Sequence, residues 1–149
     1  GQLQRGGSLW MLKAKGAADL RRGHRAGDRF AVEWVRIEHP ERGIGPDGEP
    51  DGNVREGVAN GGSVFVRLEG CYAHGDTIYF TSTSGGDAAS GQVWAYDAKA
   101  SVLQLVYESP AQETLYYPDN LAMSPRGGLI LCQDSYRQEA QSLFGLTPE

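Results

Sequence analysis

The chain has 149 residues, a length typical of one domain, with a net charge of −5 and a pI near 5.2. This acidic balance, without a basic stripe, argues against a nucleic-acid partner. No apolar run approaches the roughly 20 residues that span a membrane, and the 2 cysteines show neither a disulfide framework nor metal-ligand spacing. Glycine is frequent and the apolar residues form short clusters, which favours strands joined by tight turns.

Residues 1–37 predict two strands, Gly7–Leu12 and Phe30–Ile37, which we interpret as the outer strands C and D of one propeller blade. The segment between them is rich in basic residues and predicts a solvated loop. Residues 38–66 predict a connecting loop, because prolines and glycines interrupt Glu38–Gly57 throughout. A short helix or a weak strand is the alternative over Asn53–Val66.

The rest of the chain contains a repeat of about 50 residues, a period typical of propeller blades. Shifting Val93–Tyr96 by that period gives Leu143–Leu146, and shifting Glu69 gives Asp119. Residues 67–108 predict a full blade, whose inner strand begins near Glu69 and whose other strands are Thr77–Thr83, Gln92–Tyr96 and Val102–Glu108. Residues 118–149 predict strands A to C of the next blade, at Asn120–Met123, Leu129–Cys132 and Ser142–Leu146.

Equivalent positions of the repeat predict shared packing. Trp10, Trp94 and Phe144 fall at matching places in the three units, so we expect all three in the core. Cys132 is expected to be a buried strand residue, and Cys71 a thiol near the inner strand.

The fold class that follows is all-β. We expect a β-propeller fragment of about two and a quarter four-stranded blades, where a closed propeller needs roughly four to eight. Each blade buries its faces against its neighbours. The remaining blades of a longer parent chain are therefore the expected packing partners of this one.

Candidate site residues come from the inner strands, whose first residues face the axis of a propeller. Arg67 and Glu69 lie on the same side of a strand. They either form a strand-end salt bridge, or Arg67 holds an anion such as phosphate while Glu69 holds a hard cation. Asp119, with Asn120, is either a second cation ligand or part of a turn after Pro118.

Several strings agree with one known family in their order and spacing. They are Gly6–Lys13, Val32–Ile37, Phe65–Cys71, Ile78–Thr83 followed by Gly85-Gly86, Gly91–Asp97, Pro118–Leu121 and Ser124–Cys132. Together they resemble the PhoX-type alkaline phosphatases over nearly the whole chain, apart from the two loops.

The resemblance implies a six-bladed propeller with iron and calcium ions at its axis, which hydrolyses small-molecule phosphate monoesters. It also implies a parent protein that is exported, typically through a twin-arginine signal. The family's Arg-x-Glu, in which Arg contacts phosphate and Glu binds calcium, is similar to Arg67-Leu68-Glu69. Relatives often have Glu where this chain has Gln133, a neutral amide in place of a carboxylate. The family's iron-bridging Cys belongs to an upstream motif that neither Cys71 nor Cys132 occupies.

The function expected is therefore that of a metal-dependent phosphatase fragment, inactive on its own because most metal ligands lie outside it. Two alternatives stay open. One is a calcium-dependent, lactonase-like propeller hydrolase, which the Pro118–Pro125 segment also resembles. The other is a propeller scaffold without catalytic activity, because a fold does not imply a function.

Overall fold

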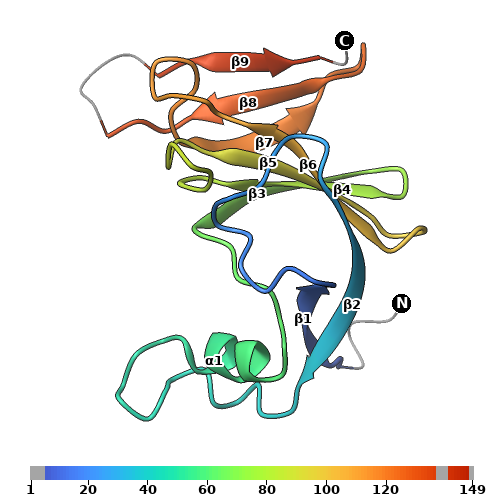
Figure 1. The fold of residues 1–149 in the computed structure, drawn as a ribbon, viewed down its shortest axis with the longest axis vertical. Helices are drawn as coiled ribbons and strands as arrows, with labels where there is room; N and C mark the ends of the chain where they lie inside the picture. The colour runs from blue at the N-terminus through green and yellow to red at the C-terminus, as the bar shows by residue number, and fades with distance from the viewer. Residues whose placement is uncertain (1–5, 137–140, 148–149) are drawn as a thin grey trace.

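The computed structural model describes residues 6–136 and 141–147, which form nine strands and one short helix (Figure 1). The mostly β character predicted from the sequence is confirmed. The parts of the predicted ranges 1–37 and 118–149 that fall on residues 1–5, 137–140 and 148–149 lie outside the described residues. The elements are β1 Leu9–Ala14, β2 Arg29–Ile37, α1 Gly52–Ala59, β3 Leu68–His74, β4 Thr77–Ser82, β5 Gln92–Asp97, β6 Val102–Glu108, β7 Pro118–Met123, β8 Leu129–Gln133 and β9 Leu143–Leu146.

Strands β3 to β6 form an antiparallel meander, and their bounds agree closely with the four strands predicted for residues 67–108. The β3–β4 turn uses Gly75 at a φ of 58°, a conformation that glycine adopts without steric cost. Strands β7, β8 and β9 form a separate three-stranded meander, at the top of Figure 1. The number of blades in a complete molecule stays a prediction.

The first two strands do not stand apart as a separate blade. Strand β2 is long enough to pair twice, with β1 over Val32–Ile37 and with β6 over Arg29–Ala31. The result is one curled, six-stranded sheet in the order β1-β2-β6-β5-β4-β3, in which β2 bends away from the meander (Figure 1). The positions of the two strands in residues 1–37 and their pairing with each other agree with the prediction, but the further pairing of β2 with β6 was not predicted.

Strand β5 is the centre of the structure because both of its faces are buried. Trp94 lies in one cluster with the fully buried Leu20, Leu103 and Leu105. Val93 points to the opposite face, as alternate strand residues must, and joins a second cluster formed with the β7–β9 sheet. Each fully buried large apolar side chain stabilises the fold by roughly 1.5–3 kcal/mol. The second cluster consists of Val93, Leu115, Leu121, Leu129 and Leu131.

The prediction of a loop over residues 38–66 is wrong for Gly52–Ala59, which forms α1. The glycines that argued against a helix serve close packing instead. A Cβ atom at Gly57 would overlap the Met11 sulfur and crowd Ile37 Cδ1, 3.1 Å away. Gly57 therefore lets α1 lie directly against the β1–β2 pair. The alternative of a short helix over Asn53–Val66 is the one that the structure bears out.

Two burial predictions also need correction. Trp94 is fully buried and Phe144 packs partly buried against the second cluster, but Trp10 is 48% exposed. Trp10 lies on the same face of β1 as Leu12 and Ala14, but burial falls along the strand and Trp10 lies at the end away from the cluster around Trp94. Cys132 is exposed, since it alternates with the buried Leu131 on β8.

Helix α1 is short, and none of the helical structure in the described part of the chain has the length and hydropathy of a membrane span.

Candidate functional site

The beginnings of β3 and β7 lie side by side, which brings the predicted site residues together. A Cβ atom at Gly70 would lie 2.6 Å from the Asp119 carbonyl oxygen and 2.7 Å from the Asn120 Cα atom. Only glycine allows the two backbones to approach so closely. Glu69 and Asp119, which the repeat placed at equivalent positions, are therefore neighbours across the junction of the two sheets.

Hydroxyl groups of β4 and the residue after it hold this junction together. The Thr81 hydroxyl accepts a hydrogen bond from the Gly70 N–H at 2.9 Å and donates one to the Asp119 carbonyl at 2.7 Å. The Thr83 hydroxyl donates to the Pro118 carbonyl at 3.1 Å. Because Thr81 and Thr83 are buried, these bonds replace lost hydration and set the position of β7 against the first sheet.

Arg67 stands just before β3 with its backbone in a left-handed conformation, at a φ of 47°. Its Nη2 lies 3.3 Å from Glu69 Oε1, and both side chains are 37% exposed. The strand-end salt bridge considered as an alternative is thus present. An ion pair this exposed contributes at most about 1 kcal/mol, so a competing ligand can separate its partners.

Two aromatic rings flank the Arg67 guanidinium. Neither ring was predicted from the sequence to belong to the site. The guanidinium carbon lies 5.4 Å from the centre of the Tyr117 ring and 5.6 Å from that of Tyr136, within the range of cation–π attraction. Burial opposes the charge on Arg67, but Tyr136 and Glu69 raise its pKa above the ordinary value. The rings limit where the guanidinium can point and leave it charged.

A third carboxylate, Asp134, belongs to the same region. Burial raises the pKa of Asp119 above its ordinary value, and the negative charges of Glu69 and Asp134 raise it further, while Arg67 opposes them. Asp134 is brought there because its N–H donates to the Tyr117 carbonyl, 2.9 Å away, at the end of the β7–β8 pair. Its position next to Gln133, where relatives often have Glu, was the one available sequence signal.

The oxygen donors of this region suit a hard cation such as calcium, for which carboxylates are the usual ligands. Glu69 and Asp119 fit that role as two ligands of a larger set. Within residues 6–136 and 141–147, however, no group of three or more potential ligands is arranged to hold a metal ion. Cys71 and Cys132 are both exposed on separate strands, and nothing in the described residues offers a donor set for iron.

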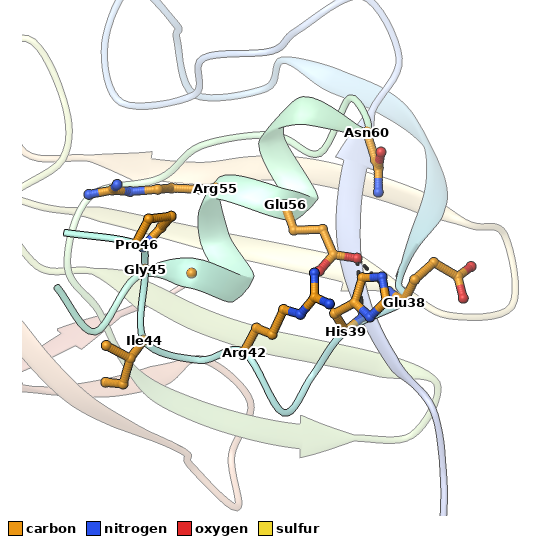
Figure 2. Close-up of a pocket in the computed structure, with 10 residues that line it drawn as sticks. Glu38, His39, Arg42, Ile44, Gly45, Pro46, Arg55, Glu56 and Asn60 are labelled. Carbon is orange, nitrogen blue, oxygen red and sulfur yellow. Dashed lines mark hydrogen bonds between the residues drawn. The ribbon is translucent and has the colours of Figure 1, made fainter. Parts of the chain in front are cut away.

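A separate cavity of about 580 Å³ lies beside α1, at the opposite end of the molecule from β9 (Figures 1 and 2). Figure 2 shows His39 and Glu56 gathered at one side of it, with Arg55 and Pro46 at the other. Arg55 is held by two carboxylates, Asp47 and Asp51, each at 2.8 Å. Its charge is therefore already compensated within the protein.

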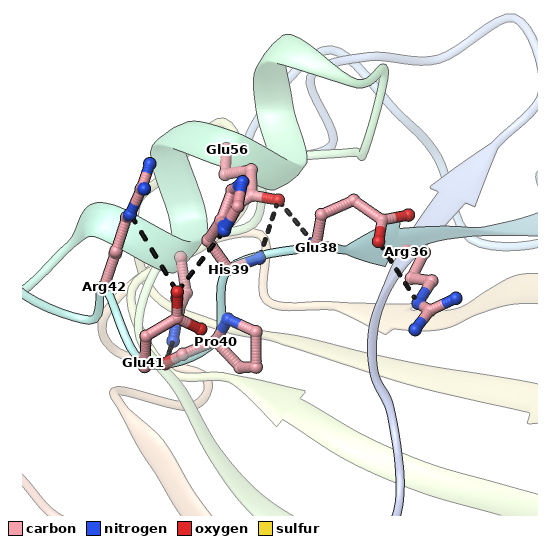
Figure 3. A network of polar contacts seen from close by, with 8 residues as sticks. Arg36, Glu38, His39, Pro40, Glu41, Arg42 and Glu56 are labelled. Atoms are coloured by element: carbon pink, nitrogen blue, oxygen red, sulfur yellow. Dashed lines mark hydrogen bonds and ion pairs between the residues drawn. The ribbon is translucent and has the colours of Figure 1, made fainter.

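The polar contacts around this cavity anchor α1 to the segment after β2 (Figure 3). Glu56 Oε1 accepts the N–H groups of Glu38 at 2.5 Å and His39 at 3.3 Å. Asn53 donates its side-chain amide to the Pro40 carbonyl at 3.3 Å. These contacts give Glu56 and Asn53 a structural role in holding α1 in place. The β3–β7 junction is therefore the better candidate for a catalytic site.

Comparison with known proteins agrees with the resemblance seen in the sequence. The family model described as alkaline phosphatase PhoX matches residues 1–149, the whole chain. No curated protein and no solved structure matches this chain. The match covers both sheets, α1 and the junction that carries Arg67, Glu69 and Asp119, and the chain therefore belongs to the PhoX alkaline phosphatase family.

Proposed function

We propose that this chain supplies the phosphate-binding arginine and part of the cation site of a metal-dependent phosphatase that hydrolyses phosphate monoesters. The family supports phosphatase chemistry and a small phosphate ester as substrate. The observation that carries the proposal is the placement of Arg67 beside Glu69, across the β3–β7 junction from Asp119. The Arg67 guanidinium can bind a phosphate group, and the carboxylates of Glu69 and Asp119 can bind the metal cation that accompanies it.

Arg67 is the proposed phosphate clamp. Its planar guanidinium can donate two parallel hydrogen bonds to phosphoryl oxygens, and it cannot lose its charge at any working pH. Tyr117 and Tyr136 would orient it. Because the bond to Glu69 is exposed and weak, phosphate would take over Arg67 and leave the Glu69 carboxylate for a cation.

Glu69 and Asp119 are the proposed calcium ligands in this chain, with Asp134 close enough to influence Asp119. Burial, with the negative charges of Glu69 and Asp134, raises the pKa of Asp119, and a bound cation would favour the charged carboxylate. Bound calcium and iron would neutralise charge on the phosphoryl oxygens and lower the barrier to hydrolysis. The iron ligands are proposed to come from other parts of the protein, as the family resemblance implies.

The complete enzyme is proposed to be a six-bladed propeller, exported from the cytoplasm, in which further blades complete the metal site. Support for neighbouring blades comes from the exposed apolar side chains of Leu9, Trp10 and Trp34 on β1 and β2. On this proposal the 149 residues alone do not hydrolyse phosphate esters. Turnover by this chain in isolation would contradict that part of it.

The test is hydrolysis of a chromogenic phosphate monoester by the full-length gene product, with calcium and iron supplied. Arg67→Ala should lower kcat/KM by about 100-fold or more, the size expected when a donor to transition-state charge is removed. Arg126→Ala is the matched control, because Arg126 is exposed in the β7–β8 turn and should leave activity unchanged.

The other outcomes separate the parts of the proposal. Activity that survives Arg67→Ala would keep the phosphatase but reject Arg67 as the clamp. Absence of phosphatase activity in the wild-type protein, together with hydrolysis of lactones, would favour the lactonase-like alternative.

A further inference from the structure

A second cavity, of about 460 Å³, adjoins the backbone that carries Arg67. This volume is within the range of small-molecule binding sites. Three separate segments meet around it, and each contributes side chains to the lining. The lining residues are Asp19, Arg21, Arg22, Val66 and Ser84.

The cavity is next to the candidate site through two of its walls. Val66 directly precedes Arg67 in the chain. Ser84 directly follows Thr83, whose N–H donates to the Arg67 carbonyl at 2.8 Å. The cavity therefore borders the backbone on both sides of Arg67, close to the residue proposed to bind phosphate.

The third wall, the segment from Asp19 to Gly23, is tied to both of the others. The N–H of the fully buried Leu20 donates to the Val64 carbonyl at 2.8 Å. On the other side, the Arg21 carbonyl accepts the Gly86 N–H at 2.8 Å, and Asp87 Oδ1 accepts the Gly23 N–H at 2.8 Å. These bonds surround Arg22 and preorganise the backbone that presents it.

Among the charged side chains that line the cavity, only that of Arg22 is available to bind an anion. Asp19 and Arg21 form a bidentate pair, with nitrogen–oxygen distances of 2.9 and 2.7 Å. The side-chain hydrogen bond from Arg21 is the main reason that the pKa of Asp19 falls from 3.8 to about 2. Among residues 6–136 and 141–147, neither the Arg22 guanidinium nor the Ser84 hydroxyl has a hydrogen-bond or ion-pair partner.

We infer that this cavity is an anion-binding subsite in which Arg22, assisted by Ser84, receives a second negatively charged group on the leaving-group side of the phosphate ester. The inference rests on the proposed phosphatase function and adds substrate class to it. It assigns a preference for phosphate esters that carry an additional carboxylate or phosphate. A charge-assisted hydrogen bond from Arg22 would supply that preference.

The test compares two esters of the same carbon skeleton, 3-phosphoglycerate and glycerol 3-phosphate, which differ by one carboxylate. Phosphate release is measured with the full-length gene product, calcium and iron supplied. The wild-type protein should prefer 3-phosphoglycerate in kcat/KM, and Arg22→Gln should lower the ratio of the two values roughly tenfold. The preference should also decline as ionic strength rises.

Arg25→Gln is the matched control, since Arg25 belongs to the same basic loop and the substitution removes the same charge, but its side chain does not line the cavity. It should leave the ratio unchanged. Equal ratios for Arg22→Gln and Arg25→Gln would mean a general field effect and would overturn the subsite. A wild-type protein without preference for the carboxylated ester would overturn it as well.

Failure of the proposed function can be told apart from failure of the subsite. If the wild-type protein hydrolyses neither ester, calorimetric titration of both esters decides the question. Tighter binding of 3-phosphoglycerate that Arg22→Gln weakens supports the subsite without catalysis. Equal affinity of the wild-type protein for the two esters rejects it.

Discussion

Two residues of the candidate site, Arg67 and Tyr117, have left-handed backbone conformations, with φ angles of 47° and 57°. For residues other than glycine this conformation costs roughly 1–2 kcal/mol. Both side chains face the same place, since Arg67 lies over the Tyr117 ring. Backbone strain at two residues that touch in space indicates that this geometry serves the site, since it does not serve stability.

Arg67→Gly should therefore give a more stable protein than Arg67→Ala, by about 1 kcal/mol, while both lack the guanidinium. Denaturant unfolding of the two variants measures the difference. The control is the same pair of substitutions at Arg36, an exposed residue of the extended strand β2, where glycine should be the less stable of the two. Equal stability of the two Arg67 variants would contradict the strain.

Asp19 gives a pH-dependent prediction in the basic loop. Its pKa in the folded protein is about 2, below the ordinary 3.8, chiefly because Arg21 donates a hydrogen bond to the carboxylate. A lowered pKa stabilises the folded state above pH 3.8 and loses that contribution as pH falls toward 2. The carboxylate is about half exposed, so the contribution is small.

Asp19→Asn should accordingly lower Tm near about pH 6, and the difference from the wild-type protein should shrink by about pH 3. Thermal unfolding across this range measures it. In an Arg21→Gln background, Asp19→Asn should have much less effect, because the partner of the carboxylate is gone. A Tm difference that stays constant with pH would rule out the ion pair as its source.

At the scale of elements, the contact between β3 and β7 decides how the two sheets meet. Thr81 bridges the strands with one hydroxyl, and Gly70 leaves no room for a side chain. The same contact sets the spacing of Glu69 and Asp119. Stability and activity should therefore depend together on this one junction.

Gly70→Ala should destabilise the protein by roughly 1–3 kcal/mol, because the new methyl group meets rigid backbone atoms of β7. Phosphatase activity should fall as Glu69 and Asp119 move apart. Gly145→Ala on β9 is the control, since a Cβ atom there meets nothing within 4 Å. If Gly70→Ala unfolds like the control, the sheets are not in close contact at this point.

For the whole molecule, the exposed apolar side chains around the start of β1 are the main liability. Leu9, Trp10 and Trp34 are 45%, 48% and 46% exposed and line one apolar patch. Strand β1 is also an edge of the six-stranded sheet among the residues described. Unpaired edges with apolar side chains associate readily.

The 149-residue chain expressed alone should therefore be marginally stable or aggregate, and Trp10→Lys should raise its monomeric fraction. Light scattering after size-exclusion chromatography, with thermal unfolding, measures both. Lys99→Ala, in the β5–β6 turn, serves as a surface control far from the patch along the chain. A sharp, reversible, monomeric melt of the wild-type chain would refute the prediction.

The sequence by itself determined the positions of the strands, the meander of β3 to β6, the family, and the equivalence of Glu69 and Asp119 in the repeat. These features depend on local composition, turn residues and a repeat, all of which can be read along the chain. Only the tertiary structure decided that β2 joins β6, that a helix forms at Gly52–Ala59, and that Trp10 is exposed while Trp94 is buried.

The same holds within the candidate site. The rings of Tyr117 and Tyr136 lie beside Arg67, and the charge of Asp134 acts on Asp119, at the end of the β7–β8 pair. Hydrogen bonds between three distant segments place Arg22 in the lining of the neighbouring cavity. Contacts of this kind depend on which edges and faces meet in space. Local periodicity does not specify that choice, because the same strand pattern can satisfy its hydrogen bonds with more than one neighbour.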